Sequence, residues 1–237
     1  MSICVDRPVQ TLAAPTRLTR LDAWSCREHL FLAATDQCAY LSSYLAGAGY
    51  DACPGNQLMH NFKCAPSIAG HDIRRGHYKR QAIRTLAHWL RCAVPRELAE
   101  QCTWVPIPPS KRRDDPDYDD RLSQTLRRAF TAYDCDVRPL LYQVCSTVSD
   151  HAGGARLGSD TLHALLRLDS AALRGRPIRQ SIVLFDDVLT SGKHFKCCER
   201  RLREALPCTP IAGVFLMRRV LSPPRRFAPP APVPEPS

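Results

Sequence analysis

The residues best suited to chemistry are two adjacent acids and the hydroxyl-rich turn that follows them. Asp186 and Asp187 come directly after the apolar run 182–185, and Thr190, Ser191 and Gly192 follow two residues later. Glycine lets backbone N–H groups close on an anion, and the two hydroxyls add hydrogen-bond donors. Carboxylates suit the vicinal hydroxyls of a sugar and, through water, a magnesium ion. The segment therefore predicts a binding site for a sugar phosphate.

The elements on either side of this turn should position it. An apolar strand over 181–185 leads into the acids, and a helix is expected from about His194. Its positive N-terminal end would attract an anion, so Lys193 and His194 should complete the phosphate pocket begun by residues 190–192. We expect Gly192 to turn consecutive N–H groups into one concavity, where any Cβ would crowd the phosphate.

Alternating strands and helices define the expected fold. The patterns predict helices at 21–44, 78–90, 121–130, 159–166 and 194–206, and strands at 103–107, 137–144, 181–185 and 211–217. Such alternation is typical of an α/β protein with a parallel sheet and helices on both faces. We expect three regions: a mostly helical N-terminal extension (1–75), the α/β domain (76–221) and a proline-rich disordered tail (222–237).

Composition limits the classes of function. The net charge of +10, from 33 Lys and Arg against 23 Asp and Glu, favours a polyanionic partner, although solvated basic faces account for most of it. The 12 cysteines contain no Cys-x-x-Cys pair, so they are expected to be small buried residues rather than zinc ligands. No secretory signal and no apolar run of about 18–20 residues are recognisable, so a cytoplasmic protein without a membrane span is expected.

The string IVLFDDVLTSG, residues 182–192, resembles the signature that binds phosphoribosyl pyrophosphate (PRPP) in type I phosphoribosyltransferases. Both have four apolar residues, two acids, two apolar residues and a Thr/Ser-rich turn that ends in glycine. The resemblance implies a type I phosphoribosyltransferase fold that binds magnesium-PRPP. It places Asp186 and Asp187 at the ribose, with Mg²⁺ held through hydroxyls or water, and residues 190–194 at the 5′-phosphate. A P-loop is excluded, because Asp187 stands where its first glycine is needed.

The resemblance extends to the segment Val105–Arg112, where the family has its pyrophosphate-binding loop. It implies that Lys111 and Arg112 bind the leaving diphosphate, although an exposed basic loop is an alternative. The ComF-like and amidophosphoribosyltransferase-like branch is the most similar. Thr190 stands where enzymes acting on 6-oxopurines have an aspartate, so purine salvage is disfavoured. Lys63 and Lys79 are weaker candidates for the site.

Two classes of function follow from this resemblance. The first is an enzyme that transfers the phosphoribosyl group of PRPP to an unidentified nitrogen nucleophile. The second is a regulatory protein that senses PRPP or a ribose 5-phosphate nucleotide without turnover, with action beside nucleic acid left open. A scaffold without ligands is a third, less favoured interpretation. Weak nucleic-acid binding and a homodimer are left open as further partnerships.

Overall fold

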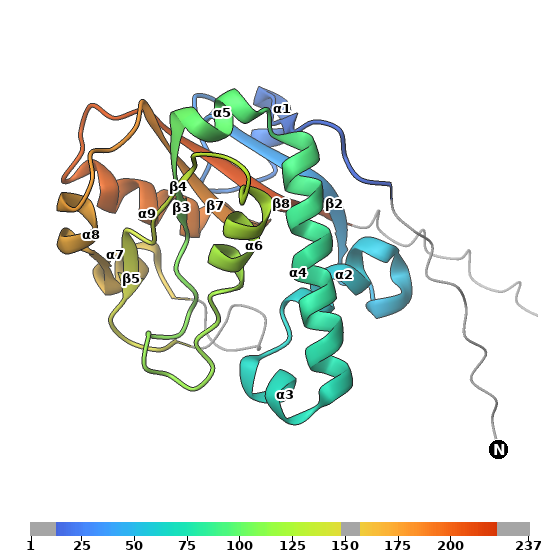
Figure 1. Ribbon diagram of the computed structural model, residues 1–237. Coiled ribbons are helices and arrows are strands. Elements are labelled where there is room, and N and C mark those ends of the chain that lie inside the picture. The colour runs from blue at the N-terminus through green and yellow to red at the C-terminus, as the bar shows by residue number, and fades with distance from the viewer. Residues whose placement is uncertain (1–12, 148–156, 222–237) are drawn as a thin grey trace, which may run out of the picture.

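A six-stranded, mostly parallel sheet forms the centre of the molecule (Figure 1), seen in a computed structural model that describes residues 13–147 and 157–221. The strand order is β1-β2-β8-β7-β3-β4, and only β1 runs antiparallel to its neighbour. The strands are β1 (Thr19–Arg20), β2 (Cys38–Ala46), β3 (Cys102–Pro106), β4 (Asp136–Val137), β7 (Ser181–Leu189) and β8 (Ile211–Leu221). The α/β prediction is thus confirmed, whereas the predicted tail 222–237 lies outside the described residues.

Helices cover both faces of the sheet. Helices α2 (Pro54–Phe62), α4 (Ile73–Ala93) and α6 (Arg121–Ala129) pack on one face, and α7 (Ser159–Leu165) and α9 (Lys193–Arg203) pack on the other. Successive side chains of β7 alternate between the two cores: Val183 and Phe185 join the first, while Ile182 and Leu184 join the second. Because the alternation continues along β7, Asp186 and Asp187 are directed to opposite faces of the sheet.

The longest helix, α4, forms for reasons visible in its sequence. Its apolar residues Ile83, Leu86 and Leu90 recur at helical spacing and are buried against the sheet. Asp72 caps it by accepting hydrogen bonds from the backbone N–H groups of the second and third helical residues. The shorter elements are α1 (Ala23–Cys26), η1 (Tyr50–Ala52), α3 (Pro66–His71), α5 (Arg96–Gln101), α8 (Ser170–Arg174) and a separate antiparallel pair, β5 (Leu141–Gln143) and β6 (Leu166–Leu168).

The helix predicted at 21–44 is wrong. The chain forms only α1 there and then β2, which pairs in parallel with β8 and places Tyr44 opposite Arg219. Leu41, Tyr44 and Leu45 have helical spacing, but pairing within the sheet overrides that pattern. Residues 38–46 are therefore part of the main sheet, and the mostly helical character expected for 1–75 holds only for the segment from η1 to α3.

The single strand predicted at 137–144 is also wrong. The structure has two short strands, β4 in the main sheet and β5 in the two-stranded sheet. Pro139 lies between them and has no N–H group with which to continue a ladder. The predicted strands near 103–107, 181–185 and 211–217 are confirmed, with β7 extending through the two acids to Leu189.

The order of the strands creates a crevice at the carboxyl ends of β3 and β7. From β3 the chain passes to β4 on one side, and from β7 it passes to β8 on the other. Ligands of open α/β sheets bind where the connections diverge in this way, beyond the carboxyl ends of the strands. Pairing between β3 and β7 ends at Phe185, so the next residues of β7 have lost their neighbour on that side.

Candidate functional site

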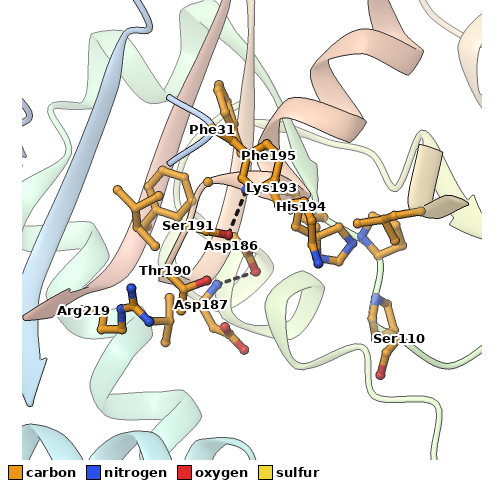
Figure 2. Close-up of a pocket in the computed structure, with 18 of the residues that line it drawn as sticks. Phe31, Ser110, Asp186, Asp187, Thr190, Ser191, Lys193, His194, Phe195 and Arg219 are labelled. Carbon is orange, nitrogen blue, oxygen red and sulfur yellow. Dashed lines mark hydrogen bonds between the residues drawn. The ribbon is translucent and has the colours of Figure 1, made fainter. Parts of the chain in front are cut away.

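A cavity of about 610 Å³ lies at this crevice and contains the predicted turn (Figure 2). Residues 186–195 form its centre. One flank comes from the loops after β3 and β5, and the other from the ends of β2 and β8 together with residues 30 and 31. The cavity is therefore enclosed by segments far apart in the sequence and centred on the end of β7.

Residues 29–32, here called the strap, fix the turn by hydrogen bonds to its backbone carbonyl groups. The Nδ1–H of His29 donates to the carbonyl oxygen of Thr190, and the backbone N–H of Phe31 donates to the carbonyl of Ser191 at 2.9 Å. In a trans peptide the N–H points opposite to the carbonyl. The N–H groups of Ser191 and Gly192 are therefore turned away from the strap, in an arrangement of the kind that binds anions in other proteins.

Gly192 adopts the left-handed conformation, with φ of 80°. Such a backbone favours glycine, so the predicted turn is confirmed. The structure adds a further reason for glycine at this position. A Cβ at Gly192 would lie 2.7 Å from Cδ2 of Leu32, so a side chain would collide with the strap. Glycine thus allows the strap and the turn to pack closely.

Helix α9 begins directly after Gly192, at Lys193. The five residues predicted to bind phosphate, Thr190, Ser191, Gly192, Lys193 and His194, all line the cavity. The buried ammonium group of Lys193 donates to the carbonyl oxygen of Leu157 at 2.8 Å, which fixes its direction. The structure therefore brings the whole predicted set together at the N-terminal end of a helix, where the partial positive charge of the helix favours anions.

The two acids have opposite surroundings because neighbouring residues of a strand face opposite sides. Asp187 is directed to the side of α2 and α6. Its Oδ1 lies 3.0 Å from Nζ of Lys63, and its Oδ2 lies 2.6 Å from Nη2 of Arg121. Burial alone would raise the pKa of Asp187, but the two cations outweigh it and hold that pKa well below its usual value. Asp187 is therefore an ionised carboxylate with both oxygens occupied.

Asp186 is directed to the side of α9, and the charges of Lys63 and Arg121 lower its pKa less than burial and the charge of Asp187 raise it. Its Oδ1 accepts a hydrogen bond of 2.8 Å from the backbone N–H of Asp187. Burial and, secondly, the charge of Asp187 raise the pKa of Asp186 to about 7. Near neutral pH this carboxyl can therefore either accept or donate a hydrogen bond to a hydroxyl group.

The ion pairs of Asp187 continue into a buried chain. Arg121 also contacts Asp119, at 2.8 Å, and Asp119 contacts Lys79, at 2.6 Å. We call Lys63, Lys79, Asp119, Arg121 and Asp187 the carboxyl-edge network. It connects α2, α4, α6 and β7, and all its members except Lys79 line the cavity. Lys63 and Lys79 were weak candidates, whereas Arg121 was missed, because nothing in its local sequence indicates a partner 66 residues away.

Lys111 and Arg112 do not join the cavity lining in the described part of the chain. Nζ of Lys111 lies 3.9 Å from Asp115, and Arg112 pairs with Asp114 in the same loop. Both basic side chains are substantially exposed. The same loop instead contributes Ser110 to the cavity. The structure therefore separates these two predicted diphosphate ligands from residues 186–194.

The fit of a magnesium ion can be tested on these acids. The described residues contain no group of three or more His, Cys, Asp or Glu side chains arranged to hold a metal. Both oxygens of Asp187 already contact a cation, so Asp186 is the less engaged of the two carboxylates. Magnesium is commonly bound through one or two carboxylates, with water and ligand phosphates completing its shell. Asp186 fits that limited role, and Asp187 could share in it only through water or ligand hydroxyls.

Comparison of the chain with protein-family models, curated proteins and solved structures found no match. None of the helices within 13–147 and 157–221 combines the length and apolarity needed to cross a membrane.

Proposed function

We propose that this protein binds PRPP or another ribose 5-phosphate compound and transfers the phosphoribosyl group to a nitrogen nucleophile, on a type I phosphoribosyltransferase fold. One observation carries the proposal. The turn 190–192 directs consecutive N–H groups away from the strap, at the start of a helix, and lines the same cavity as Asp186. The sheet order, with its switch between β3 and β7, supports the same site.

Each part of the cavity has a proposed role. Residues 190–194 hold the 5′-phosphate through backbone N–H groups, hydroxyls and the end of α9. Asp186 binds the ribose hydroxyls. Asp187 holds Lys63 and Arg121 in place, so that the two cations stabilise negative charge on the ligand. Magnesium, when bound, would neutralise ligand phosphates, with Asp186 and water as the proposed protein side of its shell.

Departure of the diphosphate needs further cations at the β3 side. Lys111 and Arg112 remain the proposed partners, and they would have to leave Asp115 and Asp114 to reach the cavity. Positioning of the ribose and electrostatic stabilisation of its developing positive charge would account for most of the rate. The nitrogen nucleophile would then attack the anomeric carbon.

The position of Lys111 and Arg112 favours a second candidate function. Residues 190–194 provide a phosphate site, but the basic side chains expected to bind a diphosphate are paired with acids of their own loop. A protein of this kind would bind PRPP or a nucleotide as a sensor, without releasing pyrophosphate. The two candidates share the 5′-phosphate pocket and differ only in turnover.

Titration calorimetry with ribose 5-phosphate and with PRPP, each with and without Mg²⁺, tests the site. Asp186→Asn should weaken binding of both ligands, because a ribose contact is lost. Asp160→Asn serves as control, because Asp160 is an exposed acid at the start of α7. An assay for pyrophosphate release with a panel of nitrogen bases then separates enzyme from sensor. Absence of binding by either ligand to the wild-type protein would refute both functions.

A further inference from the structure

The two flanks of the cavity differ in chemistry. The flank next to β3 contributes three polar, uncharged side chains, those of Ser110, Gln143 and Thr147, and the aliphatic side chains of residues 107–109. The flank next to β2 and β8 contributes Leu30, Phe31, Tyr44 and Arg219. Only the second flank combines apolar and aromatic surface with a guanidinium group. A ligand held at its phosphate by the central turn would thus meet two unlike surfaces.

Arg219 is placed in the cavity by the register of the sheet. Tyr44 and Arg219 are direct partners across β2 and β8, so their side chains share one face. The preceding residue, Arg218, is turned to the other face, where it lies 2.7 Å from Glu28 and 5.7 Å from the ring centre of Tyr40. The two adjacent arginines therefore have different surroundings: Arg218 pairs with Glu28, just before the strap, and Arg219 faces the cavity.

The guanidinium of Arg219 has no hydrogen bond or ion pair with any described residue, although three acids line the same cavity. Asp119 and Asp187 are already bound to Arg121, and Asp187 also to Lys63. An arginine that retains its five donors beside a polar cavity is suited to a carboxylate or phosphate, which it can bind with two parallel hydrogen bonds. Figure 2 shows Arg219 among the side chains that surround this opening.

We propose that Phe31, Tyr44 and Arg219 form a second anion subsite, which binds a planar ring bearing an acidic group. The ring packs against the two aromatic side chains, and Arg219 binds the acidic substituent. This inference rests on the proposed function and adds the chemical class of the acceptor: an anionic, ring-shaped nitrogen compound. A bidentate contact with a partly buried arginine should give such a ligand at least about a tenfold advantage over its uncharged analogue.

The test uses two nucleotides that differ by one carboxylate, orotidine 5′-monophosphate and uridine 5′-monophosphate. Calorimetry should show at least about tenfold tighter binding of the first to the wild-type protein. In Arg219→Gln this preference should disappear, while affinity for uridine 5′-monophosphate stays within about twofold. Arg200→Gln is the matched control, because Arg200 is an exposed arginine of α9 that pairs with Asp160 at the surface. It should retain the full preference.

Ribose 5-phosphate and PRPP complete the set of ligands. They show whether Arg219 binds an acidic group on the ring or the diphosphate of PRPP. Equal affinity of the two nucleotides, or a preference that survives in Arg219→Gln, would overturn the subsite while binding of ribose 5-phosphate still supports the proposed function. If Arg219 strengthens only PRPP, its partner is the diphosphate, and the assignment of an acidic acceptor is wrong. If the wild-type protein binds none of the four compounds, the proposed function fails and this inference fails with it.

Discussion

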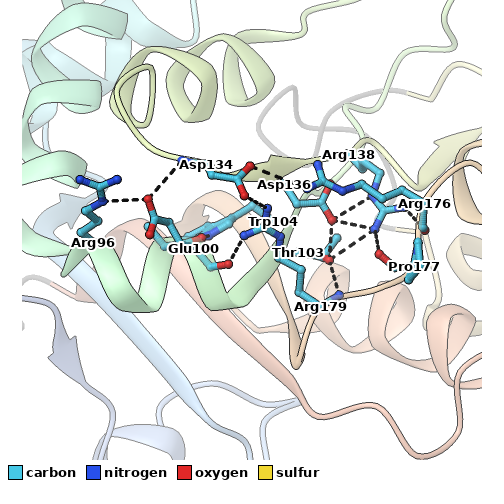
Figure 3. A network of polar contacts seen from close by, with 11 residues as sticks. Arg96, Glu100, Thr103, Trp104, Asp134, Asp136, Arg138, Arg176, Pro177 and Arg179 are labelled. Atoms are coloured by element: carbon cyan, nitrogen blue, oxygen red, sulfur yellow. Dashed lines mark hydrogen bonds and ion pairs between the residues drawn. The ribbon is translucent and has the colours of Figure 1, made fainter.

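The molecule contains two buried ion networks, at opposite ends of the same parallel strands. The carboxyl-edge network surrounds Asp187. The other, here called the amino-edge network, consists of Thr103, Asp136, Arg138 and Arg179 and lies where β3, β4 and β7 begin (Figure 3). In it, Asp136 accepts hydrogen bonds from the hydroxyl of Thr103 at 2.7 Å and from Arg138 at 2.6 Å. Both networks neutralise a buried aspartate with arginine.

The difference between them lies in what surrounds the cations. Arg138 uses its remaining donors on the backbone carbonyls of Arg176 and Pro177, so its partners all belong to the chain. Arg121 and Lys63 instead line a cavity, beside an acid with a strongly raised pKa. A charged group fixed entirely by its own chain stabilises the fold, whereas perturbed charges at a cavity indicate a ligand site. This contrast leads to four predictions.

The largest effect is expected at the amino edge. Asp136→Ala leaves the buried Arg138 without its carboxylate and should lower the free energy of unfolding by about 3–5 kcal/mol. Urea denaturation would measure this, with the exposed pair of Asp160 and Arg200 as comparison, where Asp160→Ala should cost less than about 1 kcal/mol. Similar losses for the two variants would show that the amino-edge network does not stabilise the fold in this way.

The second prediction concerns Gly192. Gly192→Val forces a β-branched residue into the left-handed region and against Leu32, so the turn should be displaced. Affinity for ribose 5-phosphate should fall at least about a hundredfold, measured by calorimetry. Gly175→Val is a useful control, since Gly175 ends α8 with an ordinary right-handed backbone and is absent from the cavity lining. Binding as tight as that of the wild-type protein in Gly192→Val would mean that the turn does not hold the phosphate.

The third prediction concerns the strap. His29→Ala removes the donor to the carbonyl of Thr190 and lets that peptide rotate, so ribose 5-phosphate affinity should fall by about tenfold, the value of roughly one hydrogen bond. His88→Ala, at an exposed histidine of α4, should have no effect. If His29→Ala unfolds more easily but binds ribose 5-phosphate normally, the strap supports the fold and does not position the turn.

The dependence on His29 also shows why part of the site could not be predicted. The segment from Asp186 to His194 carries its own signals, namely a strand end, a glycine and a helix start within nine residues, so it was found from the sequence. The strap and Arg121 act through partners 161 and 66 residues away. Only folding brings such pairs together, and no local pattern specifies them.

The same reason explains the errors in the fold. The parallel sheet followed from alternating patterns, and the strands next to the site were located correctly. Segment 38–46 was misjudged because its spacing suits a helix and its sheet partner, β8, lies near the other end of the chain. The position of Lys111 and Arg112 depends on Asp114 and Asp115 within their own loop. The order of acidic and basic residues does not by itself specify whether such cations pair within the loop or with a ligand.

The smallest expected effect sharpens the contrast between the two acids at the carboxyl edge. The pKa of Asp186 is raised from 3.8 to about 7, chiefly by burial and then by Asp187. In the pH range between these values the folded state keeps a proton that the unfolded state has lost. The stability from Asp186 is therefore fully present below about pH 4 and is lost as pH rises through about 7. Asp187, with its pKa lowered, is ionised in both states at these pH values and contributes no such slope.

Asp186→Asn should remove this slope, because asparagine does not titrate. Urea denaturation of the wild-type protein and of Asp186→Asn at about pH 5, 6, 7 and 8 would give the difference in their unfolding free energies, from which the common titration of other groups cancels. The wild-type protein should lose stability relative to the variant as pH rises. Asp169→Asn is the control: hydrogen bonds from the backbone N–H of Ala172 and from Arg113 hold the pKa of Asp169 below its usual value, so its difference should be flat over the same range. A flat difference for Asp186→Asn as well would show that Asp186 is ionised at neutral pH. It could then only accept hydrogen bonds from a ribose, and the distinction drawn between the two acids would not hold.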